Sequence, residues 1–149
     1  MTYFLREFRK LWRARSGAGA VEFALVLPVF LLMLFGTIEF CRLFWTTHAL
    51  HDVAIATARC MGVPQLECEA DGVYSAPEVK AFAKETAAGW FVTIDPASLQ
   101  LDHDAACHGL AAGFSRVEIT HQFATVLPAL LTSLAGGTDL KVEACYTNH

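Results

Sequence analysis

The stretch RSGAGAVEFALVLPVFLLMLFGTIEFCR, residues 15–42, decides how this chain is organised. It has no charged residue from Phe23 to Ile38, and residues 18–38 would form a helix about 31 Å long, close to the hydrocarbon thickness of a bilayer. A buried core helix is the alternative, but a chain of 149 residues is too small to cover such a segment on all sides. We therefore expect a transmembrane helix over residues 18–42.

Charge is unevenly distributed on the two sides of this run. Residues 1–17 carry a net charge of +4, whereas the rest of the chain carries −8. Because basic flanks stay in the cytoplasm, the N-terminus is expected inside the cell and residues 43–149 outside it, which in a bacterium is the periplasm. A cleaved secretory signal is the alternative, but the first small-residue sites, at residues 54–58, lie too far beyond the apolar run.

The surroundings of Glu22 carry a more specific pattern. A basic leader ends at Gly17, Glu22 is the fifth residue after it, and an apolar helix begins at once. This pattern resembles the class III signal that prepilin peptidases cut. Together with Pro28 and with Glu39-Phe-Cys-Arg42 after the apolar run, it resembles the TadE-like family of pseudopilins, minor components of the tight-adherence (Flp-type) pilus system. The resemblance covers roughly residues 15–60.

The resemblance implies that residues 1–17 are a leader, cut between Gly17 and Ala18. Ala18 would become the new N-terminus, and Glu22 would engage the N-terminal amine of a neighbouring subunit, with Phe23 beside it as a second assembly residue. A buried carboxylate is retained most easily when an opposite charge neutralises it. The partners implied are the membrane, a prepilin peptidase, other pilins and pseudopilins of the same fibre, and the inner-membrane assembly platform.

The helix is predicted to continue beyond the membrane. Arg42, Phe44 and Trp45 fit an interfacial anchor, and no stop signal occurs before Gly62. Residues on one face recur at helical spacing along this stretch. They are Leu43, Leu50, Val53, Ala54 and Thr57. We therefore expect a single helix that ends near residue 59, half in the membrane and half in the periplasm.

A second helix and a small sheet are predicted in the remainder. Ser75, Pro77 and Glu78 are typical of a capped helix start, and the helix should end near residues 88–89. Alternating apolar residues predict antiparallel strands over residues 97–103, 115–122 and 139–146. Residues 123–137 are expected to form a short helix over the sheet or a contact for another subunit. The expected fold class is α+β and pilin-like, with the long N-terminal helix packed on the sheet together with the second helix.

The five cysteines fall in two different parts of the chain. Cys41 lies at the predicted membrane exit and is expected to stay free. The other four, Cys60, Cys68, Cys107 and Cys145, fall in the predicted periplasmic part, where disulfides form. Three connectivities are possible. The pairing Cys60–Cys68 with Cys107–Cys145 is favoured, because it closes a short loop and ties the first sheet connection to the last strand.

A metal site and a catalytic thiol are the sharper alternatives. Residues 102–108, DHDAACH, are rich in potential ligands, but there is no paired Cys-x-x-Cys and neighbouring residues cannot all converge on one ion. Cys107 could form a nucleophile pair with His108 or His121, but a disulfide would remove the thiol. We therefore expect no metal, no cofactor and no catalytic residue.

These features, with the family resemblance, predict a minor pseudopilin of a Flp/Tad-type IV pilus rather than an enzyme. It would act in pilus assembly, by initiating, priming or tipping a fibre, and so in adhesion or biofilm formation. The alternative is an uncleaved single-pass membrane protein whose periplasmic domain is a scaffold or a sensor. The net charge of −4 argues against a nucleic-acid partner, because binding the phosphate backbone normally requires a basic surface.

Overall fold

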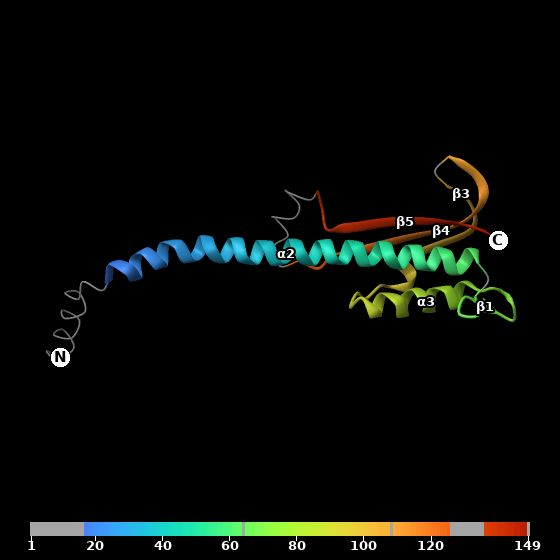
Figure 1. Ribbon diagram of the computed structural model, residues 1–149, viewed down its shortest axis with the longest axis horizontal. Helices are drawn as coiled ribbons and strands as arrows, with labels where there is room; N and C mark the ends of the chain where they lie inside the picture. Colours follow the sequence, from blue (N-terminus) through green and yellow to red (C-terminus); the bar gives the residue numbers. More distant parts are fainter. Residues whose placement is uncertain (1–16, 64, 108, 126–135, 149) are drawn as a thin grey trace. The chain divides into compact units, whose positions relative to one another are not determined.

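The computed structural model describes residues 17–63, 65–107, 109–125 and 136–148 (Figure 1). Two compact units divide the chain, Met1–Phe40 and Cys41–His149. In chain order the elements are α2 (Gly17–Gly62), β1 (Glu69–Ala70), β2 (Val73–Tyr74), α3 (Ala76–Gly89), the 3-10 helix η1 (Pro96–Ser98), β3 (Leu99–Cys107), β4 (Leu110–Gln122) and β5 (Asp139–Thr147). The expected α+β class, with a long N-terminal helix, a second helix and antiparallel sheets, is confirmed.

The first unit is described from residue 17 and is helical throughout. α2 continues through Pro28, although proline removes one backbone hydrogen bond. The hydroxyl of Thr37 donates to the carbonyl oxygen of Met33 at 2.8 Å, so this polar group is satisfied within the helix itself. An apolar segment whose polar groups are satisfied internally is what a lipid environment requires.

In the second unit, α2 contributes one face to a hydrophobic core. The expected stripe is confirmed, since Leu50, Val53, Ala54 and Thr57 are fully buried. The Thr57 hydroxyl donates to the Val53 carbonyl oxygen at 2.7 Å, which removes the cost of burying it. The helix ends at Gly62, within one turn of the expected position.

α3 packs its small residues into the same core. Val79, Ala83 and Ala87 are fully buried at a spacing of four residues, which places them on one side of the helix. Ser75 occupies the N-cap position as expected. Within the described chain, however, its hydroxyl makes no capping hydrogen bond to the helix, so the expected side-chain cap is not formed.

Three strands form the main sheet in the order β3-β4-β5, all antiparallel. One face joins the core that α2 and α3 share. Its buried members are Leu99, Val117, Ile119, Val142 and Ala144. β3 begins at Leu99, because Pro96–Ser98 forms a 3-10 turn, and the β3–β4 hairpin extends well beyond the predicted strand ends. Register shifts after Asp102 and after Ala105 mark bulges, which bend a strand.

A two-stranded hairpin, β1–β2, precedes α3 and was not predicted. Asp71 and Gly72 form its turn with φ of 56° and 77°, the conformation that favours Asp-Gly in tight hairpins. At the other end of the chain, residues 126–135 of the apolar segment 123–137 lie outside the described residues. The Phe123 N–H donates to the Thr138 carbonyl oxygen at 2.8 Å, which joins the two flanks of that segment.

Candidate assembly surface

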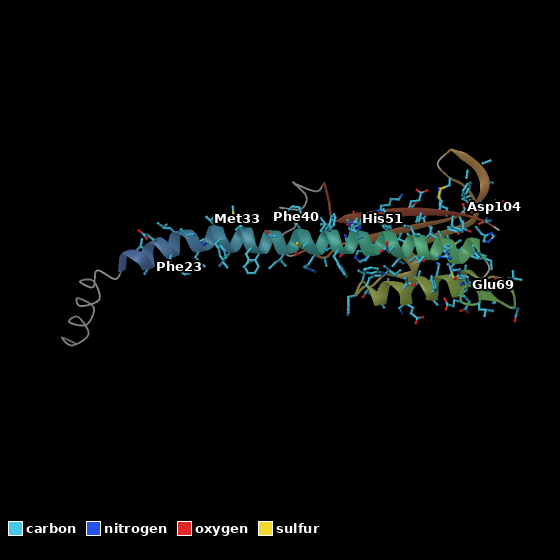
Figure 2. All side chains as sticks on the ribbon, viewed as in Figure 1. Phe23, Met33, Phe40, His51, Glu69 and Asp104 are labelled. Atoms are coloured by element: carbon cyan, nitrogen blue, oxygen red, sulfur yellow. A yellow bond between two sulfur atoms is a disulfide. The ribbon has the colours of Figure 1, made fainter. Side chains whose placement is uncertain are left out.

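The first unit presents a large apolar helical surface. Most large side chains from Val21 to Ile38 are exposed, including Phe23 at 65% and Met33 at 68%. Figure 2 shows both projecting from α2. In the described part of the chain, one helix is long and apolar enough to cross a membrane, and little of its most apolar stretch is buried. The alternative of a buried core helix is therefore wrong, and an exposed surface of this kind is suited to lipid or to other apolar helices.

Glu22 interrupts this surface near its beginning. Gly17 and Ala18 are the first two residues of α2, and Glu22 follows Ala18 by four positions, so the two lie on the same side of the helix one turn apart. The Glu22 side chain is exposed, as is Phe23. The first turn of α2 contains no acidic residue, so the helix dipole stabilises Glu22 only weakly. Residues 1–16 lie outside the described residues, and the cleaved leader stays a prediction.

Disulfides join the cysteines of the second unit. Cys60 is bonded to Cys68 and Cys107 to Cys145, the pairing that the sequence favours. The Cα atoms of Cys107 and Cys145 are 6.5 Å apart, although β4 separates β3 from β5 in the sheet. The bulges near the end of β3 bend that strand, which accounts for this approach. Cys41 is free and exposed.

Potential metal ligands do gather at the second disulfide. Ligand atoms of Cys107, Glu143 and Cys145 lie within 4.8 Å of one another in the described chain. The two sulfurs are joined, so neither is a thiolate that could bind a metal or attack a substrate. Residues 102–104 do not belong to this group, and His108 lies outside the described residues.

Residues 17–59 match the family model of TadE-like protein. The segment is therefore similar to the TadE-like family. The match begins at the first residue of α2 and ends in its last turn, and it confirms the resemblance carried by Gly17, Glu22 and Pro28. No curated protein and no solved structure matches the chain.

Outside the TadE-like segment, the outer face of the sheet is charged. Glu118 on β4 lies directly opposite Glu143 on β5, a pairing that is repulsive by itself. Lys141 Nζ lies 2.7 Å from Glu118 Oε1, and Arg116 lies 3.9 Å from Glu143. The two cations therefore neutralise the two carboxylates along the diagonals of the sheet. The Glu118 side chain is only 11% exposed, whereas those of Arg116 and Glu143 are 36% and 44% exposed. The Arg116–Glu143 pair therefore lies at a solvated surface and contributes only about 0.2–1 kcal/mol.

A cavity of about 320 Å³ opens where the end of α2, the β1–β2 hairpin and β3 meet. The rings of Tyr74 and His103 line it, with their centroids 4.8 Å apart. Burial, together with the nearby charge of Asp102, raises the pKa of the Tyr74 phenol. Tyr74 is therefore a neutral hydrogen-bonding group at neutral pH. The sequence held no sign of this cavity, because its residues come from four separate segments.

The C-terminal end of β5 is tied down beside this cavity. The Asn148 N–H donates to the Gly113 carbonyl oxygen at 3.0 Å, and its side-chain oxygen accepts from the Ser115 hydroxyl at 2.6 Å. The Asn148 side-chain amide also donates to the carbonyl oxygen of His103. Gly62, the last residue of α2, lies against this end of the chain. Asn148 thus joins β3 and β4 beyond the last paired residue of β5.

An aromatic contact joins the start of the second unit to the end of α3. The Trp45 indole Nε1–H donates to the carbonyl oxygen of Trp90 at 3.2 Å, and the two ring centroids are 5.6 Å apart in an edge-on arrangement. Phe91, the next residue, is 94% exposed. Trp45 was expected to anchor the chain at a membrane interface, but nothing in the sequence indicated that residues 90–91 lie beside it.

Proposed function

We propose that this chain is a minor pseudopilin of a Flp/Tad-type pilus that acts in pilus assembly, at initiation, priming or the fibre tip, and so in adhesion or biofilm formation. The observation that carries the proposal is the exposed apolar helix of the TadE-like segment, in which Glu22 is the sole charged residue from Gly17 to Ile38. This surface suits packing among other helices in a membrane, and no catalytic chemistry is needed for that role.

A charged Glu22 at the end of the membrane span is favourable when a cation lies beside it and neutralises the carboxylate. A charged carboxylate near the centre of a membrane costs about 2.5–3.5 kcal/mol on insertion scales, and less near the end of a span. Removal of residues 1–17 would create an ammonium group at Ala18, on the same side of the helix as Glu22 and one turn earlier. In a bundle of staggered helices, the amine of one subunit can then neutralise Glu22 of the next.

The same proposal fixes the direction of insertion and the partners. The basic residues 1–17 would remain in the cytoplasm, where a prepilin peptidase cuts after Gly17, and residues 43–149 would lie in the periplasm. The disulfides of the second unit are compatible with that oxidising compartment. The remaining partners would be other pilins and pseudopilins of the fibre and the inner-membrane assembly platform.

The first test is the intact mass of the chain extracted from membranes, after expression with and without a prepilin peptidase of the same system. We expect a peptidase-dependent loss of residues 1–17. Gly17→Val should block the cut because a branched side chain replaces the residue before the scissile bond, whereas Gly19→Val is the matched control. A full-length chain in both samples would favour the uncleaved membrane-anchored scaffold or sensor instead.

The second test separates the charge of Glu22 from its shape. Glu22→Gln keeps the size and removes the charge, and Glu22→Asp keeps the charge on a shorter side chain. We expect Glu22→Gln to insert and to be processed but to lose co-purification with the other pilins, and Glu22→Asp to retain part of it. Wild-type assembly of Glu22→Gln would show that the carboxylate charge has no part in subunit contact.

A further inference from the structure

Trp45, Trp90 and Phe91, here called the aromatic cluster, lie at one end of the second unit. The indole of Trp45 is hydrogen-bonded to the Trp90 carbonyl oxygen, so the C-terminal end of α3 is fixed beside the first turns of α2 in this unit. Trp45 is 53% exposed and Phe91 is 94% exposed. The cluster therefore presents a large aromatic surface that the described part of the second unit leaves open.

The backbone of Phe91 is strained. Its φ is 59°, in the left-handed region, where its N–H donates to the Ala88 carbonyl oxygen and the Val92 N–H donates to that of Ala87, both at 3.0 Å. Helix ends of this kind normally carry glycine, because a side chain is disfavoured there. The Phe91 ring is too exposed to compensate by packing in the described chain. Strain of this kind points to a role outside the fold.

The absence of charge around the aromatic cluster and its position in the chain indicate its binding partner. No charged residue occurs from Thr86 to Ile94, the segment that contains Trp90 and Phe91. Trp45 follows Ile38, the last residue of the uncharged run, by seven residues, which is about 10 Å of helix. Tryptophan at that distance from an apolar span is typical of the membrane–water interface.

The other end of the second unit is acidic rather than uncharged. The Cys60–Cys68 disulfide and the hydrogen bond from Ser75 N–H to the Cys68 carbonyl oxygen, at 3.1 Å, tie the start of α3 to the end of α2. α3 therefore runs back along α2 and returns its uncharged end to Trp45. Acidic residues gather instead beside the disulfide loop. They are Glu67, Glu69 and Asp71.

We propose that the aromatic cluster binds the lipid headgroup region, with the Phe91 ring inserted at the boundary of the acyl chains, and so holds the second unit against the membrane surface. Indole rings suit this position because they combine an apolar body with a polar N–H. The proposal rests on the proposed function in one respect, that α2 spans a membrane with residues 43–149 on one side of it. Neither leader cleavage nor the role of Glu22 is required.

The experiment uses the full chain in phosphatidylethanolamine–phosphatidylglycerol vesicles that carry a nitroxide quencher either near the headgroup or at the end of the acyl chain. In the Trp12→Phe background the two remaining tryptophans, Trp45 and Trp90, both belong to the aromatic cluster, and the Trp90 signal is the difference between this chain and its Trp90→Phe variant. We expect headgroup-level nitroxide to quench Trp90 more than deep nitroxide does. In the matched control, Trp90→Phe is added and Leu66→Trp places the reporter at the far end, where Leu66 is 95% exposed. That reporter should not be quenched.

Phe91→Gly supplies the decisive variant, because glycine relaxes the left-handed backbone while the ring is lost. It should lower the equilibrium constant for surface docking about ten-fold, seen as lost quenching of Trp90. Leu66→Ala, which removes an equally exposed side chain at the far end, should leave quenching unchanged. Equal quenching of Trp90 and the Leu66→Trp reporter would overturn the proposal. So would a Trp90 that nitroxide-labelled lipid does not quench but that added pilins shield from solvent.

The failures of the two proposals can be told apart. A chain that resists alkaline extraction but shows unquenched Trp90 contradicts lipid docking alone. A quenched Trp90 in a chain whose leader is never cut contradicts the pseudopilin role alone. Release of the chain from vesicles at alkaline pH would overturn both.

Discussion

Replacing Gly62 with alanine should destabilise the second unit, although alanine is the better helix former. A Cβ atom at this last residue of α2 would lie 2.9 Å from the Thr147 carbonyl oxygen and 3.0 Å from Cδ1 of Tyr146. Carbon atoms do not approach a backbone oxygen that closely without displacement. The end of β5 or the end of α2 must therefore move.

The magnitude follows from how firmly the end of β5 is held. Asn148 is bonded through its backbone to Gly113 and through its side chain to Ser115 and His103, so retreat of the neighbouring carbonyl breaks hydrogen bonds. Overpacking of this kind costs about 1–3 kcal/mol. The gain in helix propensity from glycine to alanine offsets about 0.5–1 kcal/mol. We expect Gly62→Ala to lower the free energy of unfolding by about 1–2 kcal/mol.

The assay is urea unfolding of the full chain in detergent, followed by tryptophan fluorescence in a Trp12→Phe background so that both reporters lie in the second unit. Gly89→Ala is the matched control, because Gly89 ends α3 and a Cβ there would meet nothing within 4 Å. That variant should be neutral or slightly more stable. Asn148→Ala should relax the end of β5 and reduce the penalty of Gly62→Ala. A Gly62→Ala variant as stable as Gly89→Ala would show that the end of β5 does not restrict the space beside Gly62.

Three further perturbations test other parts of the second unit. Phe91→Gly should raise the free energy of unfolding in detergent by up to about 1 kcal/mol, since it removes left-handed strain, and a loss would show that the ring packs in the fold. Cys107→Ala/Cys145→Ala removes the disulfide that closes a loop of 38 residues. We expect it to lower the free energy of unfolding in urea by about 4 kcal/mol, more than removal of the Cys60–Cys68 disulfide does. An unchanged midpoint would contradict this. Burial lowers the pKa of His121. The unfolded chain therefore takes up its proton first, and stability should fall as the pH drops below about 6.5. The fall should be smaller in His121→Gln, and equal pH profiles would contradict the assignment.

The exposed apolar helix was predictable from the sequence because its signals are local. An uncharged apolar run, a basic flank and the spacing from Gly17 to Glu22 each lie within a few turns of one helix. The disulfide pairing was favoured for a similarly simple reason, the shortness of one loop. The other bond, between Cys107 and Cys145, depends on bulges that bend β3, which residue types alone do not specify.

Most features that the sequence did not predict depend on contacts between segments far apart in the chain. β4 begins at Leu110 rather than near Ser115, because pairing with β3 orders residues whose small side chains show no clear alternation. The Asp71-Gly72 turn did carry a local hairpin signal, but strands of two residues are too short to show a period. The side-chain cap expected from Ser75 is absent although the local signal was correct. Ser75 occupies the N-cap position, but its hydroxyl makes no hydrogen bond to the first turn of the helix.

Three features can be read from the amino-acid sequence alone: one helix apolar enough to cross a membrane, the side of α2 that faces a core, and Glu22 as the charge that needs an explanation. Each of these depends on hydrophobic periodicity or composition within a single element. The hydrogen bonds of Asn148 at the end of β5 and the position of Trp90 and Phe91 beside Trp45 depend instead on the tertiary structure. Such contacts depend on the directions in which distant elements leave their turns, and those directions are set by packing of the whole core rather than by any one segment.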